Sequence, residues 1–290
     1  MTSATTTQLP APPRRGEATD GAGFVSVNGI RIWVERRGRG PDVLLLAGLG
    51  DSVEAWNLQL SGLARNYRLT AIDNRGAGRT GLPEGPLSVE LMAHDAAAVL
   101  RELGVERAHV MGFSGGSLIA QELALHHPDL VRSLVLDSTY GRLDAYGRTM
   151  MGFWRWMLTG APGEREALEA FYLWVYTPAA HADGTVDRFI DEVLAFPYAQ
   201  STEAFLAQLE AFYSHDTLDR LHRIAAPTLV LAGEVDIATR PELGRRVAER
   251  IPGAGFEVVP KQAHQPFQEI PDWFNSRVSQ FWDEVEQSGH

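Results

Sequence analysis

Residues 107–127, RAHVMGFSGGSLIAQELALHH, decide how this chain folds. Residues 107–113 form a mostly apolar run that is typical of a buried strand, and from Gly115 onward apolar residues recur at helical spacing. Between the two, Ser114 stands in a G-x-S-x-G pattern, GFSGG. A serine on this strand–turn–helix lies on a cramped backbone, where side chains in place of the flanking glycines would clash with the strand and helix. The stretch therefore predicts Ser114 as a nucleophile at the carboxyl edge of an α/β sheet, beside a helix N-terminus that favours negative charge.

Strands and helices alternate on both sides of this stretch. Two short alternating runs around Asn28-Gly29 predict a hairpin near the start. Predicted strands cover residues 24–27, 30–37, 42–47, 67–73, 107–113, 131–137, 228–232 and 256–259. Predicted helices cover residues 54–66, 87–103, 115–127, 241–250 and 273–285. Because this alternation is typical of parallel strands connected through helices, we expect an α/β protein with a mostly parallel, eight-stranded sheet flanked by helices.

The alternation stops between residues 139 and 224. That segment is helical in its pattern and rich in large aromatic residues, which predicts an inserted helical cap and an apolar, acyl or ring-shaped substrate. The α/β core then comprises residues 24–138 and 225–290. Residues 1–23, rich in Thr, Ala, Pro and Gly, are predicted to be a disordered tail.

A serine hydroxyl is a poor nucleophile at neutral pH and needs a base with an orienting acid. Asp236 follows the strand expected at residues 228–232, and His264 follows the strand expected at residues 256–259. The carboxyl ends of parallel strands meet at one edge of a sheet, so three strands bring Ser114, Asp236 and His264 together. The order serine, acid, histidine along the chain is that of α/β hydrolases.

Other residues compete for these roles. Asp137 ends the strand after the nucleophile and is the main rival to Asp236, and Glu234 is a weaker rival in the same loop as Asp236. The remaining histidines stand at helix ends, at strand starts, in the cap or at the terminus, where structural or exposed positions are the rule. They are His94, His109, His126, His127, His181, His215, His222 and His290.

With these residues in place, the chain resembles the α/β-hydrolase superfamily from residue 24 to residue 285. Two further stretches carry the resemblance. DNRGAGR at residues 73–79 is similar to the family's D-x-R-G-x-G-x-S loop, and HQPFQEIP at residues 264–271 is similar to its H-x-P-x-x-E-x-P ending. Within the superfamily the chain is most similar to small-molecule esterases and enol-lactonases.

An oxyanion needs fixed hydrogen-bond donors, and backbone N–H groups cost no reorganisation. We expect one donor at Gly115, directly after the nucleophile, and the resemblance implies Leu49 as the second. Many relatives have a histidine where this chain has Ala47, so the loop loses a supporting hydrogen bond here. Asp73 and Arg75 are interpreted as a structural ion pair and turn rather than as catalytic groups.

The composition of the chain excludes several classes of binding partner. A formal net charge of -11 argues against nucleic acids and anionic membranes, and no run approaches the ~20 apolar residues of a membrane span. No secretory h-region is present at the start, so the expected location is the cytoplasm. With no cysteine, the chain can form neither a disulfide nor a thiolate nucleophile. We find no metal-binding motif, phosphate loop or dinucleotide fingerprint, so we expect no metal and no cofactor. The expected partner is a small-molecule substrate, with a homodimer left open.

The predicted reaction is hydrolysis of a carboxylic ester or lactone through an acyl-enzyme. A carbon–carbon bond hydrolase and a cofactor-free oxygenase use the same triad residues and remain alternatives. A third alternative, from another functional class, is a ligand receptor that retains the hydrolase fold. The nucleophile Ser114 argues against epoxide hydrolases and dehalogenases, which use an aspartate instead.

Overall fold

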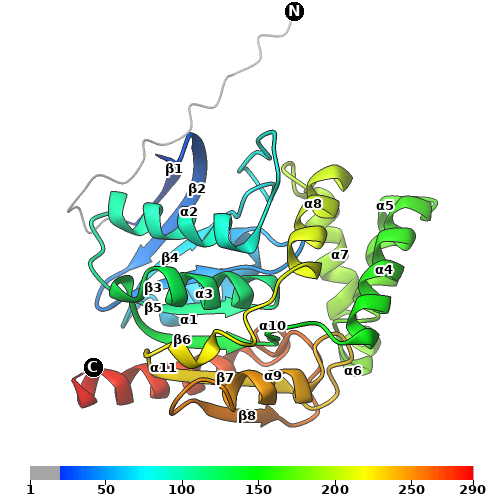
Figure 1. The fold of residues 1–290 in the computed structure, drawn as a ribbon. Coiled ribbons are helices and arrows are strands. Elements are labelled where there is room, and N and C mark those ends of the chain that lie inside the picture. Colours follow the sequence, from blue (N-terminus) through cyan, green and yellow to red (C-terminus); the bar gives the residue numbers. More distant parts are fainter. Residues whose placement is uncertain (1–19, 290) are drawn as a thin grey trace, which may run out of the picture.

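The computed structural model describes residues 20–289, and its centre is one eight-stranded sheet with the order β1-β2-β4-β3-β5-β6-β7-β8 (Figure 1). The strands are β1 (Gly21–Val27), β2 (Ile30–Gly38), β3 (Asp42–Leu46), β4 (Arg68–Ile72), β5 (Ala108–Phe113), β6 (Val131–Asp137), β7 (Thr228–Gly233) and β8 (Gly255–Val259). Strand β2 is antiparallel to both of its neighbours, β1 and β4. The six strands from β3 to β8 all run parallel to one another. The predicted α/β architecture with a mostly parallel sheet is confirmed.

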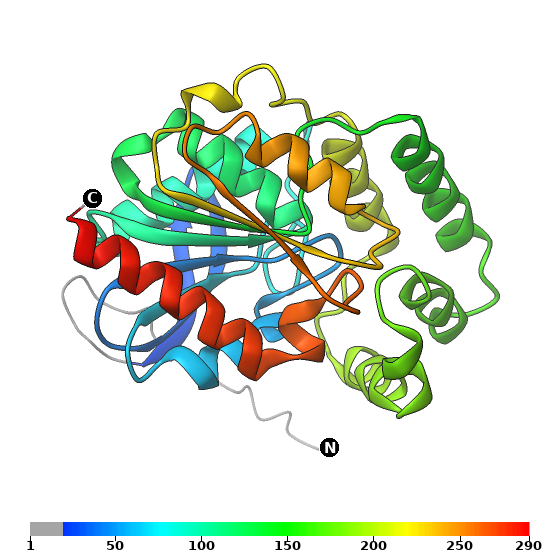
Figure 2. The same cartoon turned by 90° about the horizontal axis from the view of Figure 1, so that it is seen from below.

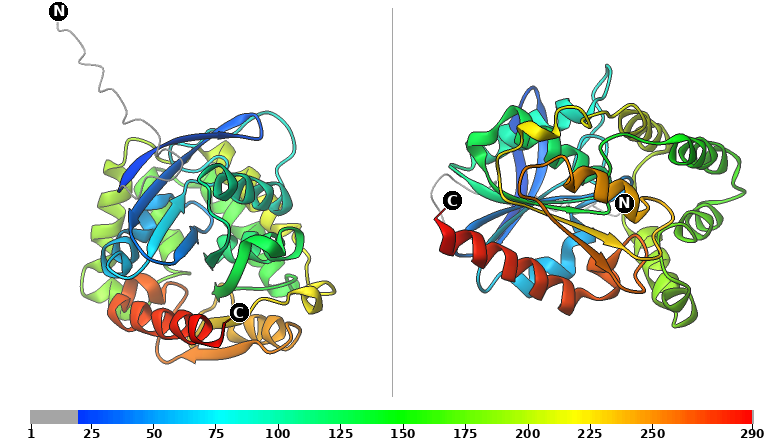
Figure 3. Two further views of the ribbon diagram at one scale, coloured as in Figure 1. Left: turned by 90° about the vertical axis from the view of Figure 1, so that its left-hand side faces the viewer. Right: turned by 60° about the horizontal axis from the view of Figure 1, so that its bottom comes forward.

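The predicted hairpin joins β1 and β2, at the edge of the sheet shown at the top of the left panel of Figure 3. Asn28 and Gly29 both have positive φ, 48° and 76°, as a tight two-residue hairpin turn requires. One boundary was wrong: residues 21–23, predicted as part of the tail, belong to β1 and pair with residues 34–36 of β2. Their Gly-Ala-Gly sequence has low strand propensity, but β2 is long enough to offer them a partner. Residues 1–19 of the predicted tail lie outside the described residues.

Helices cover both faces of the sheet, as Figures 2 and 3 show. Helices α2 (Val89–Glu102), α3 (Gly115–His126) and α9 (Pro241–Ala248) pack on one face. On the other face lie α1 (Asn57–Leu63), the short α10 (Pro266–Glu269) and α11 (Pro271–Ser288). The short 3-10 turns are η1 (Val53–Trp56), η2 (Pro128–Leu130) and η3 (Leu221–Arg223). Across residues 20–289, no helix is long and apolar enough to cross a membrane.

Residues 138–227 connect β6 to β7 and form what we call the helical insertion. Its helices are α4 (Ala145–Gly160), α5 (Glu164–Tyr172), α6 (Pro178–Ala182), α7 (Thr185–Ala195) and α8 (Thr202–Tyr213). They lie together at one side of the sheet, drawn in green to yellow at the right of Figure 1. An isolated bridge between Arg142 and Asp216 ties the two ends of the insertion together. The insertion also buries a small apolar cluster of its own around Ile190.

Candidate active site

Ser114 lies on the turn between β5 and α3 with φ 50° and ψ −119°, a conformation that L residues rarely adopt. Two of the predicted glycines permit the turn. A Cβ at Gly116 would come 1.9 Å from the carbonyl oxygen of Leu46, and one at Gly112 would come 2.3 Å from the carbonyl oxygen of Gly116. The backbone N–H of Ser114 donates to the carbonyl of Asp137 at 2.9 Å. Neighbouring backbone therefore imposes the strained conformation and holds the serine in it.

His264 follows β8 and lies between the other two predicted triad residues. Its Nε2 is 2.9 Å from Oγ of Ser114, and its Nδ1 is 2.8 Å from Oδ2 of Asp236. The backbone of His264 is fixed as well, because its N–H donates to the carbonyl of Val175 and its own carbonyl accepts from Oγ of Ser138. The ring is buried, so it is held in one orientation by contacts at both nitrogens.

Asp236 follows β7 and is almost fully buried. Its Oδ1 accepts from the backbone N–H groups of Ala238 and Thr239 at 2.7 and 2.9 Å, and its Oδ2 accepts from Oγ1 of Thr239 at 2.8 Å. Burial alone would raise the pKa of Asp236, but the charge of His264 and these hydrogen bonds outweigh burial and lower that pKa. Asp236 is therefore an ionised partner for an imidazolium at His264.

The two rival acids do not reach the histidine. Asp137 is fully buried, and neither of its carboxylate oxygens has a hydrogen-bond partner among the described residues. Burial, reinforced by the nearby charge of Asp236, raises the pKa of Asp137 well above its usual range. Glu234 is exposed and accepts from the backbone N–H of Lys261 at 2.8 Å. Of the three candidate acids, only Asp236 is hydrogen-bonded to His264.

The expected oxyanion donors flank the nucleophile. Leu49 and Gly115 both line the cavity into which Ser114 and His264 open. Where the resemblance led us to expect a missing hydrogen bond, Nδ2 of Asn74 donates to the carbonyl of Ala47 at 3.0 Å. This hydrogen bond could not be predicted from the sequence, because Asn74 lies 27 residues from Ala47.

The predicted ion pair between Asp73 and Arg75 was wrong. Asp73 instead accepts from the backbone N–H groups of Val53 and Arg79 at 2.7 and 2.8 Å. Arg75 forms a buried ion pair with Asp95 on α2. Asp73 directly follows β4 and faces backbone donors, whereas the guanidinium of Arg75 reaches the neighbouring helix α2, so the two side chains have different partners. Both residues remain structural, as interpreted.

The cavity above Ser114 has a volume of about 20 Å³ and lies within a wider hollow of about 340 Å³ that includes open solvent. Its wall combines the core edge with apolar side chains of the helical insertion. The lining residues from the insertion are Tyr140, Leu143, Met150, Met151, Trp154 and Phe212. The buried indole N–H of Trp154 has no hydrogen-bond partner among the described residues. An acyl or alcohol group bound next to the serine would therefore meet a mainly apolar surface.

Comparison with known proteins places this arrangement in a family. A family profile described as the alpha/beta hydrolase fold matches residues 41–176. A protein of Azorhizobium caulinodans named as the carbamate hydrolase RutD is 33% identical over 256 residues, covering 88% of this chain and 96% of the relative. The chain belongs to the α/β-hydrolase fold family.

Solved structures agree with the assignment of this chain to the α/β-hydrolase fold family. A Mycobacterium tuberculosis protein named as the non-heme bromoperoxidase BpoC is 30% identical with a TM-score of 0.78, covering 88% of this chain and 96% of that protein. The enol-lactonase of Burkholderia xenovorans has a TM-score of 0.80 at 24% identity, covering 90% of this chain and all of that protein. At that identity the second likeness concerns the fold. The relatives indicate that this α/β hydrolase is a hydrolytic enzyme.

Sequence reasoning missed an acidic group in the loop that carries Leu49. Burial raises the pKa of Asp51 to about 7, although the nearby charge of His264 opposes this effect. Sequence reasoning also missed the cavity residues Met150 and Met151, because it counted the aromatic residues of the insertion. Of those aromatics, only Tyr140, Trp154 and Phe212 line the cavity, whereas Trp156 is 69% exposed. Spacing along α4 could have shown which residues are buried, but not which of them face the serine.

Proposed function

We propose that this α/β hydrolase cleaves a carboxylic ester or lactone of a small, largely apolar substrate through an acyl-enzyme. The observation that carries the proposal is the continuous hydrogen-bonded array of Ser114, His264 and Asp236 at the floor of the apolar cavity. The serine hydroxyl, imidazole and carboxylate are in the arrangement that activates a serine for attack on a carbonyl.

In the proposed mechanism, Nε2 of His264 takes the proton of Ser114 as Oγ attacks the substrate carbonyl. The backbone N–H groups of Leu49 and Gly115 donate to the oxyanion of the tetrahedral intermediate. Asp236, ionised and hydrogen-bonded to Nδ1, stabilises the imidazolium. His264 then protonates the leaving alcohol, and in the second half-reaction it activates a water molecule that releases the acid.

The substrate class is inferred from the cavity wall. Leu143, Met150 and Met151 offer no hydrogen bond to a polar substituent, so a short aliphatic or aromatic acyl group is favoured over a charged one. In this proposal the helical insertion, predicted as residues 139–224, acts as the cap that excludes water from the acyl-enzyme. The hydrogen bond from His264 to Val175 in the insertion supports this role, because it connects the cap directly to the catalytic base.

Carbamate hydrolysis is a second candidate, favoured by the 33% identity to the protein named as a carbamate hydrolase. A carbamate presents a carbonyl with an alkoxy leaving group, so the same three residues would act on it in the same way. A carbamate with a free NH₂ group would, however, place a strong donor against the apolar wall described above. We therefore rank esters and lactones first.

The test is a screen of p-nitrophenyl esters of increasing acyl length, lactones, aryl carbamates and β-diketones. Wild type and Ser114→Ala are compared, with Ser61→Ala on the exposed surface of α1 as a matched serine control. We expect ester or lactone turnover that is lost in Ser114→Ala and retained in Ser61→Ala, and a fluorophosphonate that labels wild type alone. Turnover that survives Ser114→Ala in a folded protein would contradict the mechanism. Cleavage of β-diketones alone, or oxygen uptake, would support the carbon–carbon hydrolase or oxygenase instead.

A further inference from the structure

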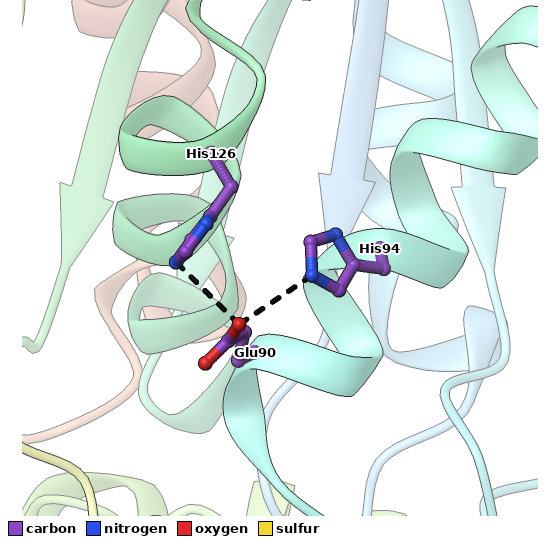
Figure 4. A group of neighbouring side chains, drawn as sticks. All are labelled: Glu90, His94 and His126. Carbon is purple, nitrogen blue, oxygen red and sulfur yellow. Dashed lines mark ion pairs between the residues drawn. The ribbon is translucent and has the colours of Figure 1, made fainter.

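Three side chains converge on the face of the sheet covered by α2 and α3, away from the candidate active site. Figure 4 shows Glu90 and His94, one turn apart on α2, pointing toward His126 at the end of α3. Oε1 of Glu90 lies 3.6 Å from Nε2 of His94 and 3.9 Å from Nε2 of His126. All three ligand atoms lie within 4.8 Å of one another.

We propose that Glu90, His94 and His126 form a binding site for a divalent transition-metal ion, with Zn²⁺ as the probe. Imidazole nitrogens with a carboxylate oxygen suit this class of ion. Tetrahedral Zn²⁺ with bonds of about 2.0–2.2 Å holds its ligand atoms roughly 3.3–3.5 Å apart. The separations of 3.6 and 3.9 Å exceed that by a few tenths of an ångström, and the two histidine nitrogens lie within 4.8 Å of each other, so side-chain rotations would have to draw the three ligand atoms together. A water molecule would complete the coordination.

The backbone beneath the site is already fixed. Nδ2 of Asn28 donates to the carbonyl of His94 and to Oδ1 of Asp95, and Asp95 forms the buried ion pair with Arg75. Side chains of Glu90, His94 and His126 are 54%, 39% and 32% exposed, so a hydrated ion can reach them. Binding would therefore require little rearrangement of the two helices.

The ring of His94 has a second partner that fixes its orientation. Its Nδ1 lies 2.8 Å from Nε2 of His127, and Nδ1 of His127 lies 3.3 Å from Nη2 of Arg101. Because Arg101 can only donate, His127 Nε2 carries the hydrogen toward His94, and His94 Nε2 then carries one toward Glu90. An ion at His94 Nε2 needs the opposite tautomers of both rings, with the hydrogen of His127 facing Arg101. Arg101 therefore orients the pair but opposes the metal-bound tautomers.

Neighbouring charges leave Glu90 as the carboxylate for the ion. Glu122 lies 3.3 Å from Nε2 of His126, but it is buried and accepts two hydrogen bonds from Arg220 at 2.9 and 2.6 Å. The site lies at the opposite end of α3 from Ser114, about 18 Å away at a rise of 1.5 Å per residue. The ion would hence link α2 to α3 and stabilise the fold, without contacting the reacting atoms.

Isothermal titration of the full chain with ZnCl₂, without an affinity tag and after chelator treatment, tests the proposal. We expect one Zn²⁺ per wild-type chain, and at least about tenfold weaker binding by His94→Gln and by His126→Gln. His181→Gln, which removes a histidine from α6 in the helical insertion, is the matched control and should bind as wild type does. Zn²⁺ should raise the Tm of wild type and of His181→Gln, and leave the Tm of the other two unchanged.

Arg101→Gln should bind Zn²⁺ more tightly than wild type, because it removes both a positive charge and the donor that opposes the metal-bound tautomers. Weaker binding by this variant would contradict the site as assigned. An absence of Zn²⁺ binding by wild type would overturn the proposal. Binding that persists unchanged in His94→Gln or His126→Gln would overturn it too, because the ion would then be held elsewhere, for instance at His264.

Discussion

The sheet edge that carries Ser114, Asp236 and His264, which we call the triad edge, differs from the helical insertion in the contacts that hold its residues in place. At the edge, backbone groups determine each position: Ser114 by its strained turn, Asp236 by two backbone donors, and His264 by bonds to its N–H and carbonyl. In the insertion, apolar side chains determine the cavity, and large residues such as Trp156 and Leu173 stay exposed. Backbone contacts therefore hold the candidate triad in place, whereas the wall of the cavity consists of side chains that a substitution can change.

The largest expected effect, after loss of the nucleophile itself, follows from Asp236→Asn. An amide cannot stabilise the imidazolium and favours the wrong tautomer of His264, so kcat should fall about 10⁴-fold. The matched change Asp137→Asn should leave kcat within about tenfold, because burial raises the pKa of that carboxyl and neither of its oxygens is hydrogen-bonded to His264. Steady-state kinetics on the best ester from the screen would measure both. Equal losses in the two variants would mean that the acid has been assigned to the wrong residue.

A matched pair of glycine substitutions tests whether close backbone packing holds the turn at Ser114 in place. Gly116→Ala would push a Cβ into the carbonyl of Leu46, and it should lower the free energy of unfolding by several kcal/mol. Gly152→Ala, in the exposed middle of α4, meets nothing within 4 Å and should raise the free energy of unfolding by about 0.5–1 kcal/mol. Urea unfolding of both variants gives the two values. A tolerated Gly116→Ala would contradict the packing at the elbow.

The sequence predicts the backbone-held triad edge better than it predicts the side chains of the helical insertion. The elbow at Ser114 was predictable because its strand, glycines and helix lie within about twenty consecutive residues. Asp236 and His264 were predictable as positions after strands, since parallel strands share a carboxyl edge. Their hydrogen bonds to Ser114 required the structure.

The predictions that were wrong or missing concern residues whose partners are distant in the sequence. The pairing of Arg75 with Asp95, the support of Ala47 by Asn74 and the first residues of β1 all depend on neighbours contributed by other elements. The same holds for the cavity wall, because periodicity along α4 shows burial without showing what a buried side chain faces. Local patterns thus predicted where Ser114, Asp236 and His264 lie better than which side chains line the cavity.

Within the insertion, substitutions of two tryptophans test whether side chains of the cavity wall determine the substrate preference. Trp154→Ala removes a wall of the cavity and should lower kcat/KM for the preferred ester by about 10–200-fold, chiefly through KM. Trp156→Ala, two residues along the same helix but 69% exposed, should change kcat/KM by less than about twofold. Kinetics across esters of different acyl length would show whether the preference itself moves. An equal response of both variants would place the substrate outside this cavity.

Stability should also depend on pH, with opposite signs in the two regions. Burial raises the folded-state pKa of Asp51 to about 7, so its contribution is present below pH ~4 and is lost as the pH rises through 7. Hydrogen bonds from Thr185 lower the pKa of Asp183 in the insertion, so its contribution is present above pH ~4 and is lost as the pH falls.

Asp51→Asn should accordingly gain stability relative to wild type at pH 8.5 and gain little at pH 4. Asp183→Asn should lose stability at pH 8.5, by a small amount because the side chain is exposed, and approach wild type in acid. Urea midpoints at pH 8.5 and pH 4 measure the trend for Asp51→Asn, and midpoints at pH 8.5 and about pH 2.5 measure the trend for Asp183→Asn. If Asp51→Asn were no more stable than wild type at pH 8.5, ionising that carboxyl would cost nothing, and burial would not govern its pKa.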